Sequence, residues 1–352
     1  IMYHPAPRAD GRKLEFIEIY NSNPFFQDMG GFRISGDIDY TFPAGTVLSG
    51  GGFLVIARNP ADLQAVSGVT NVAGPYTGSF SNKKGTVRLR NRSDAILLEV
   101  SYDSRPPWPA SADGAGHSIV LSRPSYGEGD GRAWAQSDSI GGSPGNMDGV
   151  GGEPARTVVI NEFLAHTDLP DLDYIELYNH STAAVDLSGY WLTDDPATNK
   201  FRIPDGTVIG PTGCVYFTET TMGFGLSAGG ETIFFVNSNQ TRVVDSVLFD
   251  GQENGVATGR YPDGGPGFYR QAARSPGSSN GPVRAAHDQY EVFAKPRVSD
   301  HENVPTLADK GTEEAGLHSL LPPRDLWVAD RRELSLDGQL QAEGFVPEPV
   351  DD

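Results

Sequence analysis

One short stretch of the sequence has the spacing of a catalytic serine motif. Residues 225–229, Gly-Leu-Ser-Ala-Gly, fit the pattern G-x-S-x-G, in which a strand, a sharp turn and a helix expose a nucleophilic hydroxyl beside a base. The residues that follow, 231–236, are β-branched and aromatic and predict a strand where the motif requires a helix. The match is therefore interpreted as a coincidence within a hairpin. The sequence predicts no catalytic residue.

Two glutamates occupy matching positions of an internal repeat. Glu18 lies in Phe-Ile-Glu-Ile-Tyr-Asn and Glu176 in Tyr-Ile-Glu-Leu-Tyr-Asn, each between aromatic residues that share its face of a predicted strand. A carboxylate in that position must be paired, solvated or raised in pKa. A general acid or base is one interpretation, but each repeat lacks a second catalytic group at a defined spacing. We favour structural carboxylates, held by a neighbouring strand or loop.

Acidic loops make calcium the best ligand hypothesis. Hard cations take several loop oxygens, and aspartates gather before one predicted strand and after another: Asp168, Asp171, Asp173, Asp194 and Asp195. These runs do not match the twelve-residue calcium pattern of helix–loop–helix proteins, and Asp also forms turns without a metal. We therefore expect either calcium or no cofactor. The single cysteine, Cys214, and the unpaired spacing of the histidines give no zinc pattern.

Aromatic residues raise a second ligand hypothesis. Trp108 and Trp134 are candidate glycan contacts, with Trp191 and Tyr261 as further candidates, because sugars stack on exposed aromatic faces. We favour the alternative interpretation, that these rings belong to the core, as most tryptophans of β-sandwiches do.

The elements that must position these residues follow from a repeat that spans most of the chain. Residues 42–48, Phe-Pro-Ala-Gly-Thr-Val-Leu, return as 203–209, Ile-Pro-Asp-Gly-Thr-Val-Ile, and both copies close on Ser-Pro-Gly, at 143–145 and 275–277. Each copy reads as short strands separated by Gly, Pro, Asn and Asp turns, without an amphipathic helix of three turns. This pattern predicts an all-β chain with two β-sandwiches in tandem.

The two copies also set the domain boundaries. Residues 1–148 and 157–281 are the predicted sandwiches, and the glycine-rich residues 149–156 are a short flexible linker between them. Residues 282–352 match neither copy and contain 15 acidic and 7 basic residues. By composition this segment is an extended acidic linker, a stalk or a partial third module.

The start of the chain suggests a missing part. Aligning His4 with His166 places Ile1 opposite Phe163, inside a predicted strand. We therefore expect this chain to be a fragment of a longer polypeptide, with further domains as its neighbours.

The repeated motifs resemble those of lamin tail domains. They are an Ile-Asn-Glu opening, the aromatic-Ile-Glu-Leu-Tyr-Asn strand, the stretch Asp-Leu-Ser-Gly-Tyr-Trp-Leu-Thr-Asp at 186–194, the Ile-Pro-Asp-Gly-Thr-Val-Ile turn and the final Ser-Pro-Gly. The resemblance implies immunoglobulin-like β-sandwiches. Bacterial members of the lamin tail domain family are tandem modules of large secreted or surface proteins, often beside hydrolase or spore-coat-kinase-like domains, and the resemblance implies a similar setting for this chain. The first copy departs from the family at residues 27–32, Gln-Asp-Met-Gly-Gly-Phe.

Composition narrows the function classes. The 352 residues include 27 Lys and Arg and 46 Asp and Glu, for a net charge of −19, which opposes binding to nucleic acid or to an anionic membrane. No apolar run approaches the roughly 18 residues needed for membrane insertion. We expect a non-catalytic module at the cell surface or outside the cell that binds, adheres or spaces, with a polysaccharide or a cell-surface protein as partner. Alternatives are a targeting appendage of an enzyme whose catalytic domain lies outside this segment, and a structural stalk.

Overall fold

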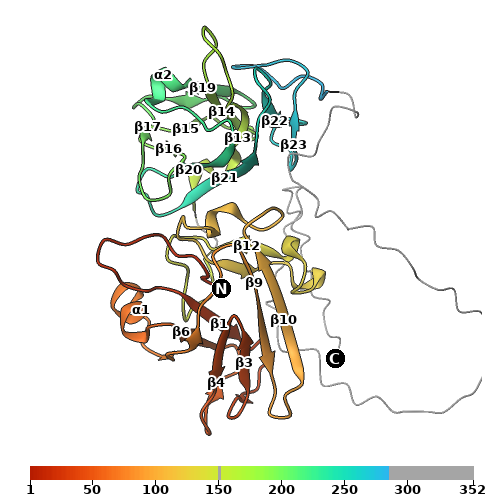
Figure 1. Ribbon diagram of the computed structural model, residues 1–352. Helices are drawn as coiled ribbons and strands as arrows, with labels where there is room; N and C mark the ends of the chain where they lie inside the picture. Colours follow the sequence, from red (N-terminus) through yellow and green to blue (C-terminus); the bar gives the residue numbers. More distant parts are fainter. Residues whose placement is uncertain (150–151, 285–352) are drawn as a thin grey trace, which may run out of the picture.

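The structure, a computed structural model, describes residues 1–149 and 152–284. These residues form two β-rich modules stacked end to end, module one from residues 1–149 and module two from residues 152–284 (Figure 1). Most of the predicted acidic segment lies outside the described residues. Within the described parts of the chain, no helix is both long and apolar enough to span a membrane.

Module one contains two main sheets. One has the strand order β10-β9-β3-β4-β8 and the other β1-β6-β7, with the pairs β2-β5 and β11-β12 at the sides. The strands are β1 (Phe16–Tyr20), β2 (Gln27–Asp28), β3 (Arg33–Gly36), β4 (Ile38–Thr41), β5 (Val47–Leu48), β6 (Phe53–Ala57), β7 (Val72–Ala73), β8 (Thr77–Gly78), β9 (Lys84–Arg90), β10 (Ile96–Asp103), β11 (Ile119–Leu121) and β12 (Trp134–Gln136).

Short helices connect the strands of module one. Helix α1 (Pro60–Ser67) begins at Asn59, whose side chain accepts a hydrogen bond from the backbone of Asp62, and ends at Gly68 in the left-handed conformation (φ 75°). The single-turn 3-10 helices are η1 (Ala110–Ala112), η2 (Pro124–Tyr126) and η3 (Gly131–Ala133). These helices are all shorter than three turns, as the sequence pattern predicts.

Module two has the same plan with shorter loops. Its sheets have the orders β19-β14-β13-β22-β23 and β17-β16-β20-β21, with the pair β15-β18 beside them. Its elements are η4 (Pro154–Thr157), β13 (Val158–Leu164), β14 (Tyr174–Asn179), β15 (Val185–Asp186), β16 (Trp191–Thr193), β17 (Phe201–Arg202), β18 (Val208–Ile209), β19 (Cys214–Thr218), α2 (Glu219–Met222), β20 (Gly230–Val236), β21 (Val243–Asp250), β22 (Thr258–Arg260) and β23 (Phe268–Arg270).

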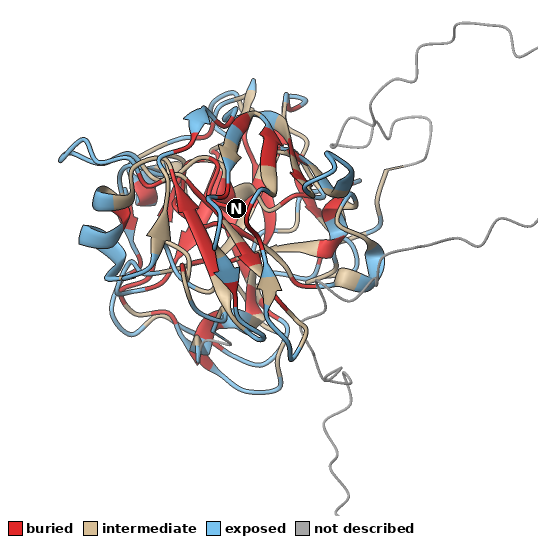
Figure 2. Ribbon diagram, turned by 90° about the horizontal axis from the view of Figure 1, so that it is seen from below, coloured by how far each residue is buried: buried red, intermediate tan, exposed pale blue. Residues whose placement is uncertain are grey.

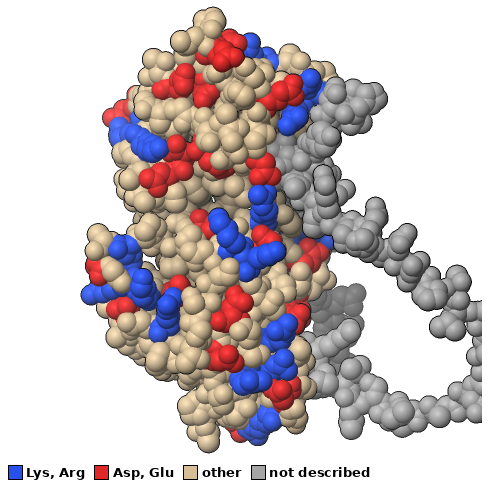
Figure 3. Space-filling view, in the orientation of Figure 1, with Lys and Arg blue, Asp and Glu red and all other residues tan. Residues whose placement is uncertain are grey.

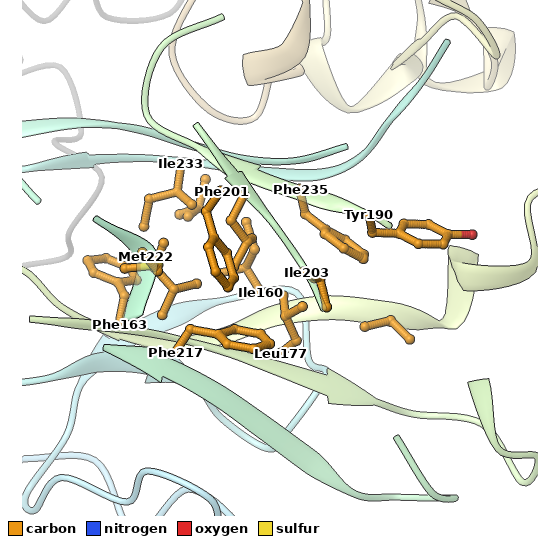
Figure 4. Close-up of a cluster of buried hydrophobic side chains, with 14 of the residues drawn as sticks. Ile160, Phe163, Leu177, Tyr190, Phe201, Ile203, Phe217, Met222, Ile233 and Phe235 are labelled. Carbon is orange, nitrogen blue, oxygen red and sulfur yellow. The ribbon is translucent and has the colours of Figure 1, made fainter. Parts of the chain in front are cut away.

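The core of module two fills the space between its two main sheets. Ile160, Leu177 and Phe217 come from one sheet, and Ile233 and Phe235 come from the facing sheet (Figure 4). Side chains alternate between the two faces of a strand, so a strand that buries Leu177 in the core directs its neighbour at position 176 to the outer face. Seen from below, buried residues gather on strands in the interior, and exposed residues lie mainly on helices and loops at the outside (Figure 2).

The two modules pair their first strands at matching positions of the sequence repeat. Met2 bridges to Phe16 in module one, and Leu164 pairs with Tyr174 in module two. This is the register that the sequence alignment of the two copies predicts. The chain is all-β with two immunoglobulin-like sandwiches, as the sequence predicts.

The two modules meet in a hydrogen-bonded interface. The fully buried His117 of module one accepts a hydrogen bond at Nε2 from the backbone N–H of Val243 on β21, at 2.9 Å. The side chain of Gln136 donates to the carbonyl of Val243 at 2.6 Å, and the backbone N–H of Ile140 donates to the carbonyl of Thr241 at 2.8 Å. Module one therefore caps the outer edge strand of a module-two sheet.

Apolar and ionic contacts complete this interface. Ala115 of module one packs into a buried cluster with Phe234, Val236 and Val243 of module two. Arg105 forms an ion pair with Asp250 at 2.9 Å, and Arg242 forms another with Asp138.

The end of the expected linker belongs to module two. Glu153 accepts a hydrogen bond from the Tyr190 hydroxyl at 2.5 Å and another from the side chain of Asn237 at 3.0 Å. Ala155 is completely buried in the module-two core. Residues 153–156, predicted as flexible linker, are therefore held in place by these contacts.

Candidate functional site

The repeated glutamate of module two is buried beneath the closing segment of its own module. Glu176 on β14 has no exposed surface. Its Oε1 accepts a hydrogen bond from the side chain of Asn161 at 3.1 Å, and its Oε2 accepts one from the backbone N–H of Gly277 at 2.7 Å. Gly277 belongs to the closing Ser-Pro-Gly, so the carboxylate ties residues 272–281, the closing strap of module two, to the sheet.

A second buried carboxylate acts on the same strap. Glu162 on β13 lies opposite Glu176 in the strand register. It accepts hydrogen bonds from both the backbone N–H, at 3.0 Å, and the hydroxyl of Ser275, and another from the hydroxyl of Tyr174. Glu162 is the Glu of the Ile-Asn-Glu opening, a residue to which the sequence pattern assigns no role. A strict period of two from Val158 and Ile160 would direct residue 162 into the core, and the register shift between Ile160 and Glu162 places it opposite Glu176 on the outer face instead.

Module one uses its repeated glutamate in the same way. Glu18 on β1 accepts a hydrogen bond from the backbone N–H of Gly145 at 2.5 Å, and Gly145 is the glycine of the first Ser-Pro-Gly. Residues 138–148 are therefore the closing strap of module one. The structural interpretation of the two glutamates predicted a hydrogen bond or salt bridge to a neighbouring strand or loop. In the structure each carboxylate accepts a hydrogen bond from a backbone N–H of the closing strap of its module.

Burial shifts the ionisation of both glutamates. It raises the pKa of Glu176 to about 7, against the opposing effect of the bonds from Asn161 and Gly277. It likewise raises the pKa of Glu18 to about 7, opposed by the N–H of Gly145. Such values suit a general acid or base, but a proton donor must also reach a substrate. Each carboxyl group instead accepts a hydrogen bond from the strap that covers it.

The half-buried cysteine of module two, Cys214, lies close to Glu176. Cys214 pairs across the strands with Tyr178, and burial raises the pKa of its thiol to about 12, with the nearby Glu176 adding to the effect. A thiol with this pKa is protonated at neutral pH and is a poor nucleophile.

The five candidate calcium ligands do not form one site. Each already has a partner within the protein: Asp168 with Asn254, Asp171 with Arg274, Asp173 with Thr167 and Leu226, Asp194 with Lys200, and Asp195 with Ala197 and Thr198. Among the residues that the structure describes, no three His, Cys, Asp or Glu side chains are arranged to hold a metal ion.

Two of these aspartates border a shallow hollow in module two. Asp171 and Asp173 line it together with His166 and Glu219, and its volume is about 230 Å³. Asp173 is largely buried and accepts hydrogen bonds from the hydroxyl of Thr167 at 3.0 Å and the backbone N–H of Leu226 at 2.9 Å. Its oxygens therefore hold the walls of the hollow together.

The two candidate glycan contacts, Trp108 and Trp134, lie against each other at the module-one core. Trp108 is buried, with 7% of its surface exposed, and belongs to the module-one core. Its ring lies 5.8 Å from that of the half-buried Trp134, whose Nε1 donates to the carbonyl of Glu128. The position of Trp108 does not fit the glycan hypothesis, because its proline-flanked loop folds back onto the core. The alternative core interpretation describes its position.

The serine motif has no catalytic surroundings. Ser227 lies in the turn before β20, and its backbone N–H donates to the Glu231 carboxylate at 2.7 Å. A strand follows the motif, as the sequence predicts, so the strand–turn–helix geometry of a nucleophile elbow is missing at this position.

Two solved structures have a remote likeness to this chain. One is an exo-β-D-glucosaminidase inhibited by castanospermine and amino-australine analogues, at 8% identity and a TM-score of 0.16. Another is the exo-chitosanase of Amycolatopsis orientalis in complex with PNP-β-D-glucosamine, at 8% identity and a TM-score of 0.17. Each match covers 66% of this chain and 25% of the other. Similarity at this level carries no argument about fold or function.

Comparison with protein families gives a definite result, whereas a search of curated proteins finds no match. The model of the lamin tail domain matches residues 1–104 and 152–251, which is more than half of the chain. The two matches fall one in each module and include the two repeated glutamates, Glu18 and Glu176, and the strands around them. The chain belongs to the lamin tail domain family, with two copies of the domain in tandem.

Proposed function

We propose that this chain is a non-catalytic binding and spacing unit of a larger protein at the cell surface or outside the cell. The observation that carries the proposal is the use of the repeated glutamates. Glu18 and Glu176 occupy matched positions in the middle of a strand in the two copies, and each binds a backbone N–H of the strap above it. These carboxylates therefore stabilise the fold, and we infer that the modules serve as rigid scaffolds whose loops contact the partner.

The interface between the modules supports the spacing role. Hydrogen bonds, ion pairs and a buried apolar cluster join module one to β21 of module two. Two domains joined by a flexible linker alone would vary in their relative orientation. Docked modules instead hold a fixed separation between whatever lies at their two ends.

Surface charge bears on the choice of partner. On the face seen in Figure 3, basic and acidic side chains are interspersed, and the whole chain carries a net charge of −19. Such a surface suits a polysaccharide or a cell-surface protein better than a nucleic acid, which needs an extended basic surface. A targeting appendage of a hydrolase or spore-coat-kinase-like enzyme, whose catalytic domain lies outside this segment, is the second candidate, and a structural stalk is the third.

Retention on candidate partners tests this proposal. The full 352-residue chain would be immobilised and exposed to neutral polysaccharides, anionic polysaccharides and cell-envelope proteins, and the same chain would be assayed with chromogenic hydrolase substrates. We expect retention of at least one partner class and no turnover. Retention of none would contradict the binding role and favour the stalk. Turnover that Glu176→Gln abolishes without unfolding would contradict the non-catalytic role.

A further inference from the structure

The tip of one loop in module one carries two exposed phenylalanines. Phe25 and Phe26 lie between β1 and β2, with 77% and 70% of their surface exposed. These are the largest exposed fractions of any aromatic side chain in residues 1–149 and 152–284. Single exposed apolar residues are normal on protein surfaces, whereas adjacent large ones mark a site of interaction.

Module two forms the same loop with alanines in these positions. The Asn21 side chain donates to the carbonyl of Phe25 at 2.8 Å, and the Asn179 side chain donates to the carbonyl of Ala183 at 2.7 Å. Asn21 and Asn179 are both completely buried and follow the repeated Glu-Ile/Leu-Tyr sequence. Phe25 and Phe26 thus correspond to Ala183 and Ala184. Because the loop forms with alanines, folding does not require the two phenyl rings.

A second loop fixes the tip in place. Asn21 also donates to the carbonyl of Leu48 at 3.2 Å, and the backbone N–H of Gly51 donates to the carbonyl of Asn21 at 2.8 Å. A Cβ on Gly50 would come within 2.4 Å of the Pro24 backbone, so the two loops lie in direct contact. A tip ordered before binding loses little entropy when a partner arrives.

The tip is uncharged within a strongly acidic chain. Residues 21–27, Asn-Ser-Asn-Pro-Phe-Phe-Gln, and residues 48–52, Leu-Ser-Gly-Gly-Gly, contain no ionisable side chain, although the net charge of the chain is −19. A charged polymer or an anionic membrane finds no counter-charge there. Neutral sugars instead offer C–H faces for aromatic rings and hydroxyls for the amides and hydroxyls of the same loops.

We propose that the tip formed by Phe25 and Phe26 binds a neutral polysaccharide, with sugar rings packed on the phenyl faces. The proposal rests on the binding role proposed above and names its surface and the class of its ligand. The proposed glycan contact is thus the pair of exposed rings on this loop and not the buried Trp108.

A double substitution tests the proposal. The full chain and its Phe25→Ala/Phe26→Ala variant would be co-sedimented with insoluble cellulose and chitin, and run by affinity electrophoresis through a soluble neutral β-glucan, at low and high NaCl. We expect the variant to lose about tenfold or more in affinity, as for truncation of aromatic hot spots. Its melting temperature should be unchanged, because module two carries alanines in the same frame. Binding by the wild-type chain should vary little with salt, since the tip is uncharged.

The matched variant Ala183→Phe/Ala184→Phe places the same rings on module two. Added binding by this variant supports the proposal. Equal binding by the wild type and the double-alanine variant would overturn the tip as the site but leave the binding role standing. Retention of envelope proteins without any polysaccharide would likewise overturn the proposed polysaccharide site at the tip and leave the binding role standing. Retention of no partner at all would overturn both the proposed site and the binding role. Phe-dependent binding to phosphatidylcholine vesicles, or Phe-dependent dimerisation, without glycan binding would overturn the assigned ligand.

Discussion

Burial at Glu176 couples its ionisation to folding. Its pKa rises from an ordinary value of 4.5 to about 7 in the folded chain, so the folded state holds the proton more tightly than the unfolded state. The resulting stabilisation is complete below pH 4.5 and is lost as the pH rises to 7. Since one pKa unit corresponds to about 1.4 kcal/mol, the effect amounts to roughly 3 kcal/mol. Glu18 follows the same direction for the same reason.

Glu176→Gln tests this coupling. Glutamine keeps one acceptor oxygen but cannot ionise, and it leaves one buried hydrogen bond of the strap badly paired. We expect the variant to be less stable than the wild type by about 1–3 kcal/mol at pH 5, and the difference to shrink or reverse by pH 7.5. Denaturant unfolding of both proteins across this range measures it. A difference that does not change with pH would mean that the carboxyl is not desolvated.

Trp108→Ala separates a core residue from a surface contact. Because Trp108 is buried among core residues and packs on Trp134, its removal should destabilise the chain by about 3–5 kcal/mol. Tyr261→Ala, at a residue 45% exposed, is the matched control and should cost less than about 1 kcal/mol. Thermal unfolding measures both. A stable Trp108→Ala protein with altered ligand binding would restore the glycan interpretation.

The sequence predicts which strand residues face the core better than it predicts which loops contact the strands. The alternation in the repeated strands fixes which side chains enter the core, so the sandwich, the repeat and the outward placement of Glu176 follow from sequence. The partners of the glutamates do not, because Gly277 lies 101 residues after Glu176 and Gly145 lies 127 residues after Glu18. Only the fold brings such segments together, although both glycines belong to the repeated Ser-Pro-Gly.

The acidic loops of module two yield a prediction about calcium. The aspartates are engaged by neighbours such as the Arg274 side chain at Asp171 and the Lys200 ammonium at Asp194, so binding a cation would require these contacts to break. We expect millimolar calcium to leave the melting temperature of the full chain unchanged, with magnesium as the control for ionic effects. A calcium-specific rise that Asp173→Asn abolishes would contradict this expectation.

At the scale of the whole molecule, the two sandwiches are joined by contacts that the sequence gives no sign of. The glycine-rich residues between the copies predict a flexible connection, whereas His117 lies 126 residues from its partner Val243 and Arg105 lies 145 residues from Asp250. Burial lowers the pKa of His117 to about 4. Its contribution to stability is therefore present above about pH 6.5 and is lost as the pH falls towards 4.

Calorimetry of the full chain at pH 7.5 tests most directly whether the two modules act as one rigid unit. We expect the two modules of the wild type to unfold together in one coupled transition. The Ala115→Arg variant forces a charge into the cluster of Phe234, Val236 and Val243. We expect this variant to unfold in two separate transitions. Two independent transitions in the wild type, at temperatures that Ala115→Arg does not change, would contradict the account.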